Sequence, residues 1–184
     1  MSRLDHMEAV IRETTRGSVP DVTFRDDVAR TFTGEFPRLF RFLNRLTGDA
    51  DLASDLAQDA FVRLYSRGSM PDEPCAWLIS VALNLFRNTR TTAARRRRLL
   101  TPFRAEAVMA DPPAVPGVAL ENEARREQVR RVLRRLSERD RQLLLLRAES
   151  YRYREIAAAL ELNEASVGTL LARAKRAFLE ASDQ

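Results

Sequence analysis

Prolines divide this chain into two stretches. Four of its eight prolines lie between residues 102 and 116, and a helix cannot continue through a segment so rich in proline. On both sides of it, apolar residues recur at three- and four-residue spacing, which is typical of helices. Because so long a structureless loop is unusual inside one domain, we expect an all-α chain of two small helical domains joined by a flexible linker at 101–118.

The first domain is predicted over 23–100, after an N-terminal tail at 1–22. Its apolar face begins at Phe24 and continues past Pro37, where we expect a new helix to start, since proline suits a first turn. A second helix is predicted over 50–66. A third begins after a loop and runs from about 75 to 90 or beyond.

The second domain is predicted over 119–184, beginning with a charged helix at 119–136. Ser137, with an acidic residue three positions later, resembles a capping box, and Asn163 is a candidate N-cap for a last helix over 164–181. The helix that ends near Leu160 and the last helix are separated by a short turn. This spacing is that of a helix-turn-helix, although a helical hairpin in a bundle has the same pattern.

The composition argues against several classes of protein. One cysteine (Cys75) and one histidine (His6) cannot form a disulfide framework or a Cys/His zinc site. The usual catalytic and phosphate-binding motifs are missing, and no stretch approaches the ~18 apolar residues of a membrane span. We therefore expect a cytoplasmic binding protein that is not an enzyme, holds no cofactor and does not insert into a membrane.

Charge is distributed unevenly along the first domain. No acidic residue lies between Glu73 and Glu106, whereas seven arginines do. Guanidinium groups match phosphate oxygens, and Asn84 and Asn88, one helical turn apart, favour nucleic acid over a solvated charge run. The preceding helix has an acidic outer face, for which spacing alone favours a solvated surface over a docking site. Opposite charge on two faces suggests two different partners.

These residues resemble a known family. The segments FPRLFRFLNRLTGDADLASDLAQDAFVRLY and AWLISVALNLFRNTR are similar to region 2 of bacterial extracytoplasmic-function sigma factors. The segment LRRLSERDRQLLLLRAESYRYREIAAALELNEASVGTLLARAKRAF is similar to their region 4. The resemblance covers about 36–100 and 133–178, in the family's order, with the proline-rich linker between them. It implies a specificity subunit of RNA polymerase that directs the core enzyme to promoters and assists melting of the −10 element.

The resemblance also implies residue roles. The core polymerase, through the clamp helices of its largest subunit, would contact Asp55, Gln58, Asp59 and Arg63. The −10 element would be bound by loop 68–74, with Met70 and Asp72, and by Asn84, Arg87, Asn88, Arg90, Arg95, Arg96, Arg97 and Arg98. The −35 element would be bound by Asn163, Ser166, Thr169, Arg173 and Arg176. The polymerase flap and an anti-sigma factor are further expected partners, and the expected location is the cytoplasm, at the nucleoid.

The last helix departs from the family pattern at two positions. Gly168 replaces a common cation, and Leu170 stands where another arginine is frequent. Glycine within a helix also costs about 1 kcal/mol relative to alanine. The −35 contact is therefore expected to be weak or to depend on DNA shape, or else this helix binds protein more than DNA.

Two other functions remain open from the sequence. A stand-alone helix-turn-helix regulator would bind duplex DNA tightly without polymerase, which a gel shift with and without core enzyme would reveal. A helical adaptor or anti-factor would show little salt-sensitive DNA binding in any context.

Overall fold

The computed structural model describes residues 22–100 and 119–183, with side chains described for 22–92 and 125–183. All regular structure in these residues is helical. In chain order the helices are α2 (Val22–Thr47), α3 (Ala50–Arg67), α4 (Pro74–Leu100), α5 (Ala119–Arg135), α6 (Glu138–Ala148), α7 (Tyr153–Leu160) and α8 (Glu164–Ser182). The expected all-α class is confirmed for the described residues. The predicted linker at 101–118 and all of the predicted tail at 1–22 except Val22, which begins α2, lie outside them.

Local capping residues set most of the helix boundaries. The Asp49 side chain accepts a hydrogen bond from the Leu52 backbone N–H at 3.0 Å and starts α3, and Gly68 ends it with a left-handed φ of 75°. The predicted caps at Ser137 and Asn163 are confirmed, because their side chains accept from the N–H groups of Asp140 and Ala165.

The predicted break near Pro37 is wrong, since α2 is one helix with this proline inside it. Proline removes one backbone hydrogen bond and costs about 3 kcal/mol or more in a helix interior. Aromatic packing in the turn just before Pro37 helps to offset this cost. The Phe32 and Phe36 rings stack with centroids 4.7 Å apart, and the Phe61 ring of α3 lies 5.0 Å and 6.1 Å from them.

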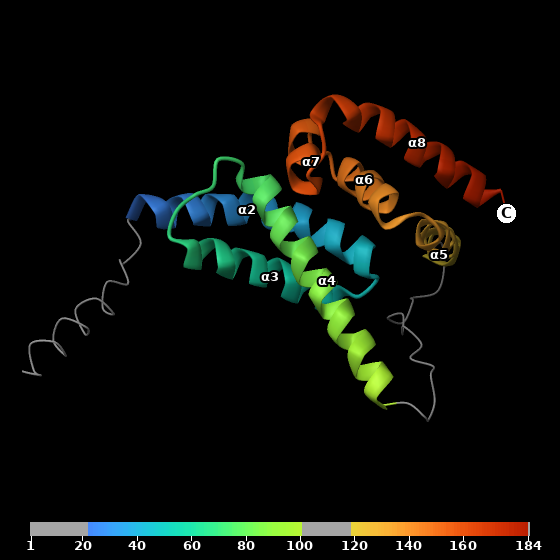
Figure 1. Ribbon diagram of the computed structural model, residues 1–184, viewed down its shortest axis with the longest axis horizontal. Coiled ribbons are helices and arrows are strands. Elements are labelled where there is room, and N and C mark those ends of the chain that lie inside the picture. The colour runs from blue at the N-terminus through green and yellow to red at the C-terminus, as the bar shows by residue number, and fades with distance from the viewer. Residues whose placement is uncertain (1–21, 101–118, 184) are drawn as a thin grey trace, which may run out of the picture.

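The first unit is a three-helix arrangement in which α3 lies along α2 and α4 crosses both (Figure 1). Its core consists of side chains that α2, α3 and α4 each bury at helical spacing. The fully buried ones include Phe42, Leu43, Leu64, Ile79 and Leu83. Burial of each such side chain contributes about 1.5–3 kcal/mol, so this unit rests on apolar packing.

The second unit is built around α6, α7 and α8, with α5 packed against α8 (Figure 1). Leu143, Leu146, Ile156 and Val167 are fully buried between these helices. The α7–α8 connection is tight, because Glu161 adopts a left-handed φ of 54° and Asn163 already caps α8. This is the helix-turn-helix geometry expected from the sequence.

The two units pack against each other. The helix α6 contacts α2, and α7 contacts α4, so buried residues of both units form one continuous hydrophobic cluster. Cys75, at the start of α4, is half-buried beside this contact. Burial first, and then the carboxylates of Glu35 and Glu155, raise the pKa of its thiol to about 12, which keeps the thiol protonated at neutral pH. Among the described residues, no helix is both long and apolar enough to cross a membrane.

Ser150 gives a stability prediction, because this non-glycine residue has a left-handed φ of 63° at the end of α6. The change Ser150→Gly is expected to raise the free energy of unfolding by about 0.5–1 kcal/mol, since glycine adopts this conformation without a Cβ clash. Urea denaturation followed by circular dichroism measures the change.

The matched control is Ala172→Gly, at an exposed position in regular helix α8. The same new residue should there lower stability by about 1 kcal/mol. Equal effects of the two substitutions would contradict the assignment of strain to Ser150.

Candidate nucleic-acid interface

The outer face of α3 is exposed and acidic. Asp55, Gln58, Asp59 and Arg63 all point to solvent, while the opposite side of the helix buries Leu56, Ala60 and Leu64 in the core. Within the described residues, neither Asp55 nor Asp59 has an ion-pair partner, and the Gln58 amide donates only to Ser54 Oγ at 3.0 Å. The face therefore presents carboxylates to solvent without an ion pair among the described residues, which suits contact with a basic partner.

The predicted −10 residues lie at two places on α4 and its preceding loop. Asn84, Arg87 and Asn88 are exposed on one side of the helix, and the Arg87 Nη1 donates to Asn84 Oδ1 at 2.8 Å. In the loop, Met70 is half-buried against the core and Asp72 is exposed. Arg95–Arg98 belong to the last turns of α4, and their side chains lie outside the described ones.

Two of the expected phosphate-binding arginines already have partners. Arg90 Nη1 lies 3.2 Å from Glu138 Oε2, and Arg87 Nε lies 3.8 Å from Glu138 Oε1. Glu138 is on α6 of the second unit, so one carboxylate there faces both cations of α4. This pairing was not expected from the sequence, in which the arginine window contains no acidic residue.

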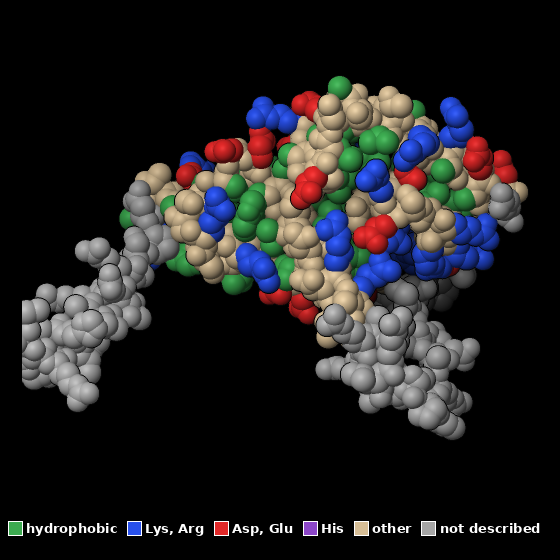
Figure 2. Space-filling view, in the orientation of Figure 1, with side chains coloured by type: hydrophobic (Ala, Val, Ile, Leu, Met, Phe, Trp, Pro, Cys, Tyr) green, Lys and Arg blue, Asp and Glu red, His purple; other side chains and the backbone are tan. Residues whose placement is uncertain are grey.

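The predicted −35 residues share the exposed side of the helix-turn-helix. Asn163, Ser166, Thr169, Arg173 and Arg176 are all exposed, while Val167, Leu171 and Ala174 point inward. The Arg173 guanidinium lies 3.4 Å from Asp140 Oδ1. Arg176 has no ion-pair partner among the described residues and remains available to phosphate. Figure 2 shows a further group of Lys and Arg side chains gathered over α5.

Sequence reasoning missed two residues beside this face. The Tyr153 ring is exposed and lies against Gly168, where an added Cβ would be 3.6 Å from Tyr153 Cε2. The Arg147 guanidinium lies 5.7 Å from the centre of the same ring. An aromatic ring, itself near a cation, thus borders the position where α8 lacks a side chain. The unexpected glycine was the only signal in the sequence, and it does not identify its neighbour.

Comparison with known proteins gives a consistent family. A family model described as Sigma-70 region 2 matches residues 32–97, and one described as Sigma-70, region 4 matches residues 126–178. No curated protein matches the chain. Among solved structures, it is similar to the sigma factor RpoE of Bartonella quintana, solved in complex with the anti-sigma factor NepR. That similarity has a TM-score of 0.63 at 21% identity and covers 84% of this chain and 96% of the other.

Both region models match in the order in which the two helical units occur, and the fold similarity extends across both units. Sigma factors are initiation factors rather than enzymes. The chain belongs to the sigma-70 family, and its two helical units correspond to region 2 and region 4 of that family.

Proposed function

We propose that this chain directs RNA polymerase core to specific promoters and assists melting of the −10 element at the start of transcription. The observation that carries the proposal is the combination of an unpaired acidic face on α3, an Asn/Arg side of α4 and a helix-turn-helix in one chain. The α3 face suits docking to a protein, the Asn/Arg side of α4 suits capture of a DNA single strand, and the helix-turn-helix suits binding of duplex DNA. The chain itself then needs no catalytic group, and it acts in the cytoplasm, at the nucleoid.

The proposed residue roles are those that the resemblance to sigma factors implies, and the exposure and chemistry of the residues support them. Asp55, Gln58, Asp59 and Arg63 are proposed to contact the clamp helices of the polymerase. Loop 68–74 with Asn84 and Asn88 is proposed to hold a flipped base of the −10 element, whose extrusion costs a few kcal/mol. The exposed side of α8 is proposed to contact the −35 element, and the second unit to meet the polymerase flap.

A stand-alone regulator of the helix-turn-helix type is the alternative. In that case the acidic face of α3 would have no role, and α8 would bind duplex DNA equally well with and without core enzyme. Gel shifts on a mapped promoter in both conditions distinguish the two. Binding that is strong without core, together with unchanged transcription start sites, would reject the sigma-factor proposal.

An anti-sigma factor is a further proposed partner. The similar RpoE structure contains such a protein, and the fold similarity over both units supports a comparable partner here. Purification of the tagged chain from its own cells, followed by identification of a stoichiometric small partner that blocks core binding, would test this.

The first prediction concerns core binding. The double change Asp55→Ala/Asp59→Ala should weaken binding to purified core polymerase at least about tenfold, equivalent to 1.4 kcal/mol, because two exposed charges that face a basic partner are lost. Fluorescence anisotropy of the labelled chain measures the affinity. Asp26→Ala, at an exposed position of α2, is the control and should leave it unchanged. A double variant that binds core normally would show that α3 is not the docking face.

The second prediction concerns promoter opening. Asn84→Ala/Asn88→Ala should abolish open-complex formation, measured by permanganate reactivity of −10 thymines, because the amide contacts that offset base extrusion are removed. Affinity for core should stay unchanged, since both side chains are exposed and far along the chain from α3. Thr92→Ala, also exposed on α4, should open promoters normally. Loss of core binding in the double variant would contradict the assignment.

A further inference from the structure

A cavity of about 880 Å³ lies where helices of both units meet. Its lining residues come from α2, α5, α6 and α8, and Figure 2 shows Lys and Arg side chains gathered over α5. Small-molecule sites usually have about 300–1,000 Å³, so the cavity has the volume of such a site. None of the residues proposed to contact the polymerase clamp or DNA lines it.

One part of the cavity wall is apolar. Leu133 of α5 and Leu145 of α6 are buried in it, and Phe178 of α8 is half-buried. The apolar stripes of α5 and α8 continue from there to side chains that remain exposed, since Val129 is 41% and Leu179 is 63% exposed. Exposed apolar side chains around a concave site favour contact with an apolar group.

The other part of the wall is cationic. Six of the described lining residues carry positive charge and none carries negative charge, the six being Arg41, Arg45, Arg125, Arg126, Arg130 and Lys175. Lys175 has no ion-pair partner among the described residues. Outside the lining, Glu127 Oε2 lies 3.4 Å from Arg130 Nη1. Cations gathered in a concave site attract anions.

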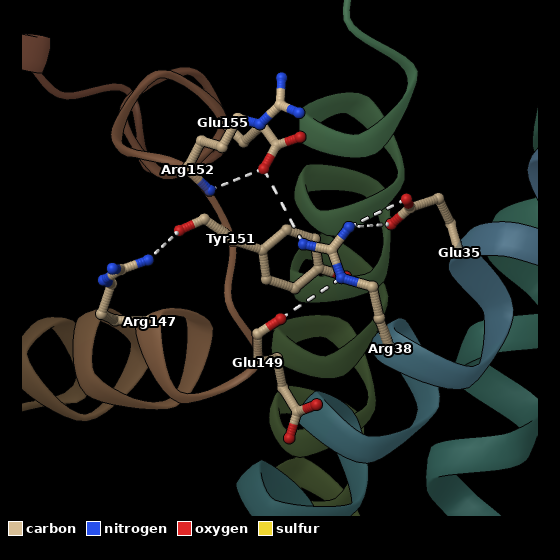
Figure 3. Close-up of polar contacts among 7 residues, drawn as sticks. All are labelled: Glu35, Arg38, Arg147, Glu149, Tyr151, Arg152 and Glu155. Carbon is tan, nitrogen blue, oxygen red and sulfur yellow. Dashed lines mark hydrogen bonds and ion pairs between the residues drawn. The ribbon is translucent and has the colours of Figure 1, made fainter.

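The cations of α2 share one carboxylate. Arg41 Nε lies 2.7 Å and Arg45 Nη1 3.0 Å from the two carboxylate oxygens of Glu149. This carboxylate points away from the Arg38 guanidinium (Figure 3), so it compensates the cations of the cavity instead.

Donors on this side of the cavity remain available. The Arg41 and Arg45 side chains are 50% and 51% exposed, and each guanidinium has more N–H donors than its contact with Glu149 uses. Asn44, on the same face of α2, also lines the cavity and is half-buried without a side-chain hydrogen bond among the described residues. Positive charge and hydrogen-bond donors are therefore both in excess here.

The two parts of the wall together select the chemistry of a ligand. Guanidinium and ammonium groups bind a carboxylate or phosphate head group, and the apolar side chains require a hydrocarbon chain beside it. A partner's helix, with a diameter of about 10–12 Å, has a volume of about 500 Å³ per turn, so the cavity holds fewer than two turns of one. A small amphiphile fits both the volume and the charge.

We propose that this cavity binds a single-chain amphiphile with an anionic head group, such as a fatty acid. Its chain would lie against Leu133, Leu145 and Phe178, and its head group among the cations of α2, α5 and α8. The proposal goes beyond the proposed function and does not rest on it, because binding by the free chain requires neither polymerase nor DNA.

The first experiment tests the class of ligand. Isothermal titration calorimetry measures binding of octanoate, decanoate and dodecanoate to the full chain, below the concentrations at which they form micelles. Each added pair of CH₂ groups should strengthen binding about tenfold. Butyrate and inorganic phosphate should not bind measurably, and dodecyltrimethylammonium should bind at least about tenfold more weakly than dodecanoate. Equal affinities along the series, or for the cationic amphiphile, would overturn the proposal.

The second experiment tests the apolar part of the wall. Leu179→Asp places a carboxylate beside the proposed chain and should weaken dodecanoate binding at least about tenfold. Val62→Asp, on α3, is the matched control, because Val62 is 61% exposed and Leu179 63%. It should bind dodecanoate as the wild type does. A Leu179→Asp variant with wild-type affinity would exclude this cavity as the site.

The third experiment tests the cationic part. Lys175→Glu should weaken dodecanoate binding roughly fivefold, since an exposed cation is replaced by an anion. Arg131→Glu, at an exposed position of α5 outside the lining, makes the same change in net charge and should have no effect. Circular dichroism melting curves should agree for all four variants, because all four positions are exposed. Equal loss in both charge variants would contradict a local head-group site.

Two further measurements identify other occupants of this face. Co-sedimentation with phosphatidylglycerol vesicles tests a bilayer surface, and sedimentation velocity tests a second copy of the chain. Dodecanoate binding by a monomeric chain, weakened by Leu179→Asp and Lys175→Glu, supports the proposal. A chain that binds vesicles or dimerises through Leu179 but does not bind dodecanoate would overturn it.

Discussion

The arrangement of this protein depends on one buried carboxylate, that of Glu149, placed between two arginines of the other half of the chain. Buried ion pairs add little net stability, because desolvation cancels much of the attraction. Their effect is specificity, since only one relative position of α2 and the α6–α7 turn gives the carboxylate its cations. Apolar side chains of both units are buried against each other at the same boundary. The charges determine which apolar surfaces come together.

The sequence predicts the parts whose causes are local. Ser137 and Asn163 cap helices because a side chain two or three positions away from a backbone N–H reaches it whatever the rest of the chain does. Pro37 was misjudged because its cost is offset by Phe61, on a different helix. The pairing of Arg90 with Glu138 could not be predicted, because residues 48 positions apart show no pattern in the sequence. An arginine every three or four positions on α2 is likewise the pattern of an ordinary solvent-exposed helix face. The site residues were found from a resemblance, while their internal partners required the fold.

The packing of the two units affects the acidic face of α3 and the arginines of α4 differently. The acidic side chains of α3 stay exposed, whereas Arg87 and Arg90 of α4 are both near the Glu138 carboxylate of the second unit. A protein partner can therefore reach α3 before anything rearranges. A nucleic acid that contacts Arg87 or Arg90 has to replace the Glu138 carboxylate there, an exposed pairing worth about 0–1 kcal/mol.

The length of α4 links two parts of the −10 surface mechanically. This helix is unbroken from Pro74 to Leu100, and at about 1.5 Å per residue it spans about 40 Å. The loop before it and the arginine run at its far end are consequently two ends of one helix, whose first half packs on the core through side chains between Ala76 and Phe86. Because the core holds the loop end of this helix, the direction of the arginine end is set by the same packing that places the loop. Capture of the −10 base by the loop and binding of phosphates by the arginine run are therefore performed by the two ends of the same helix.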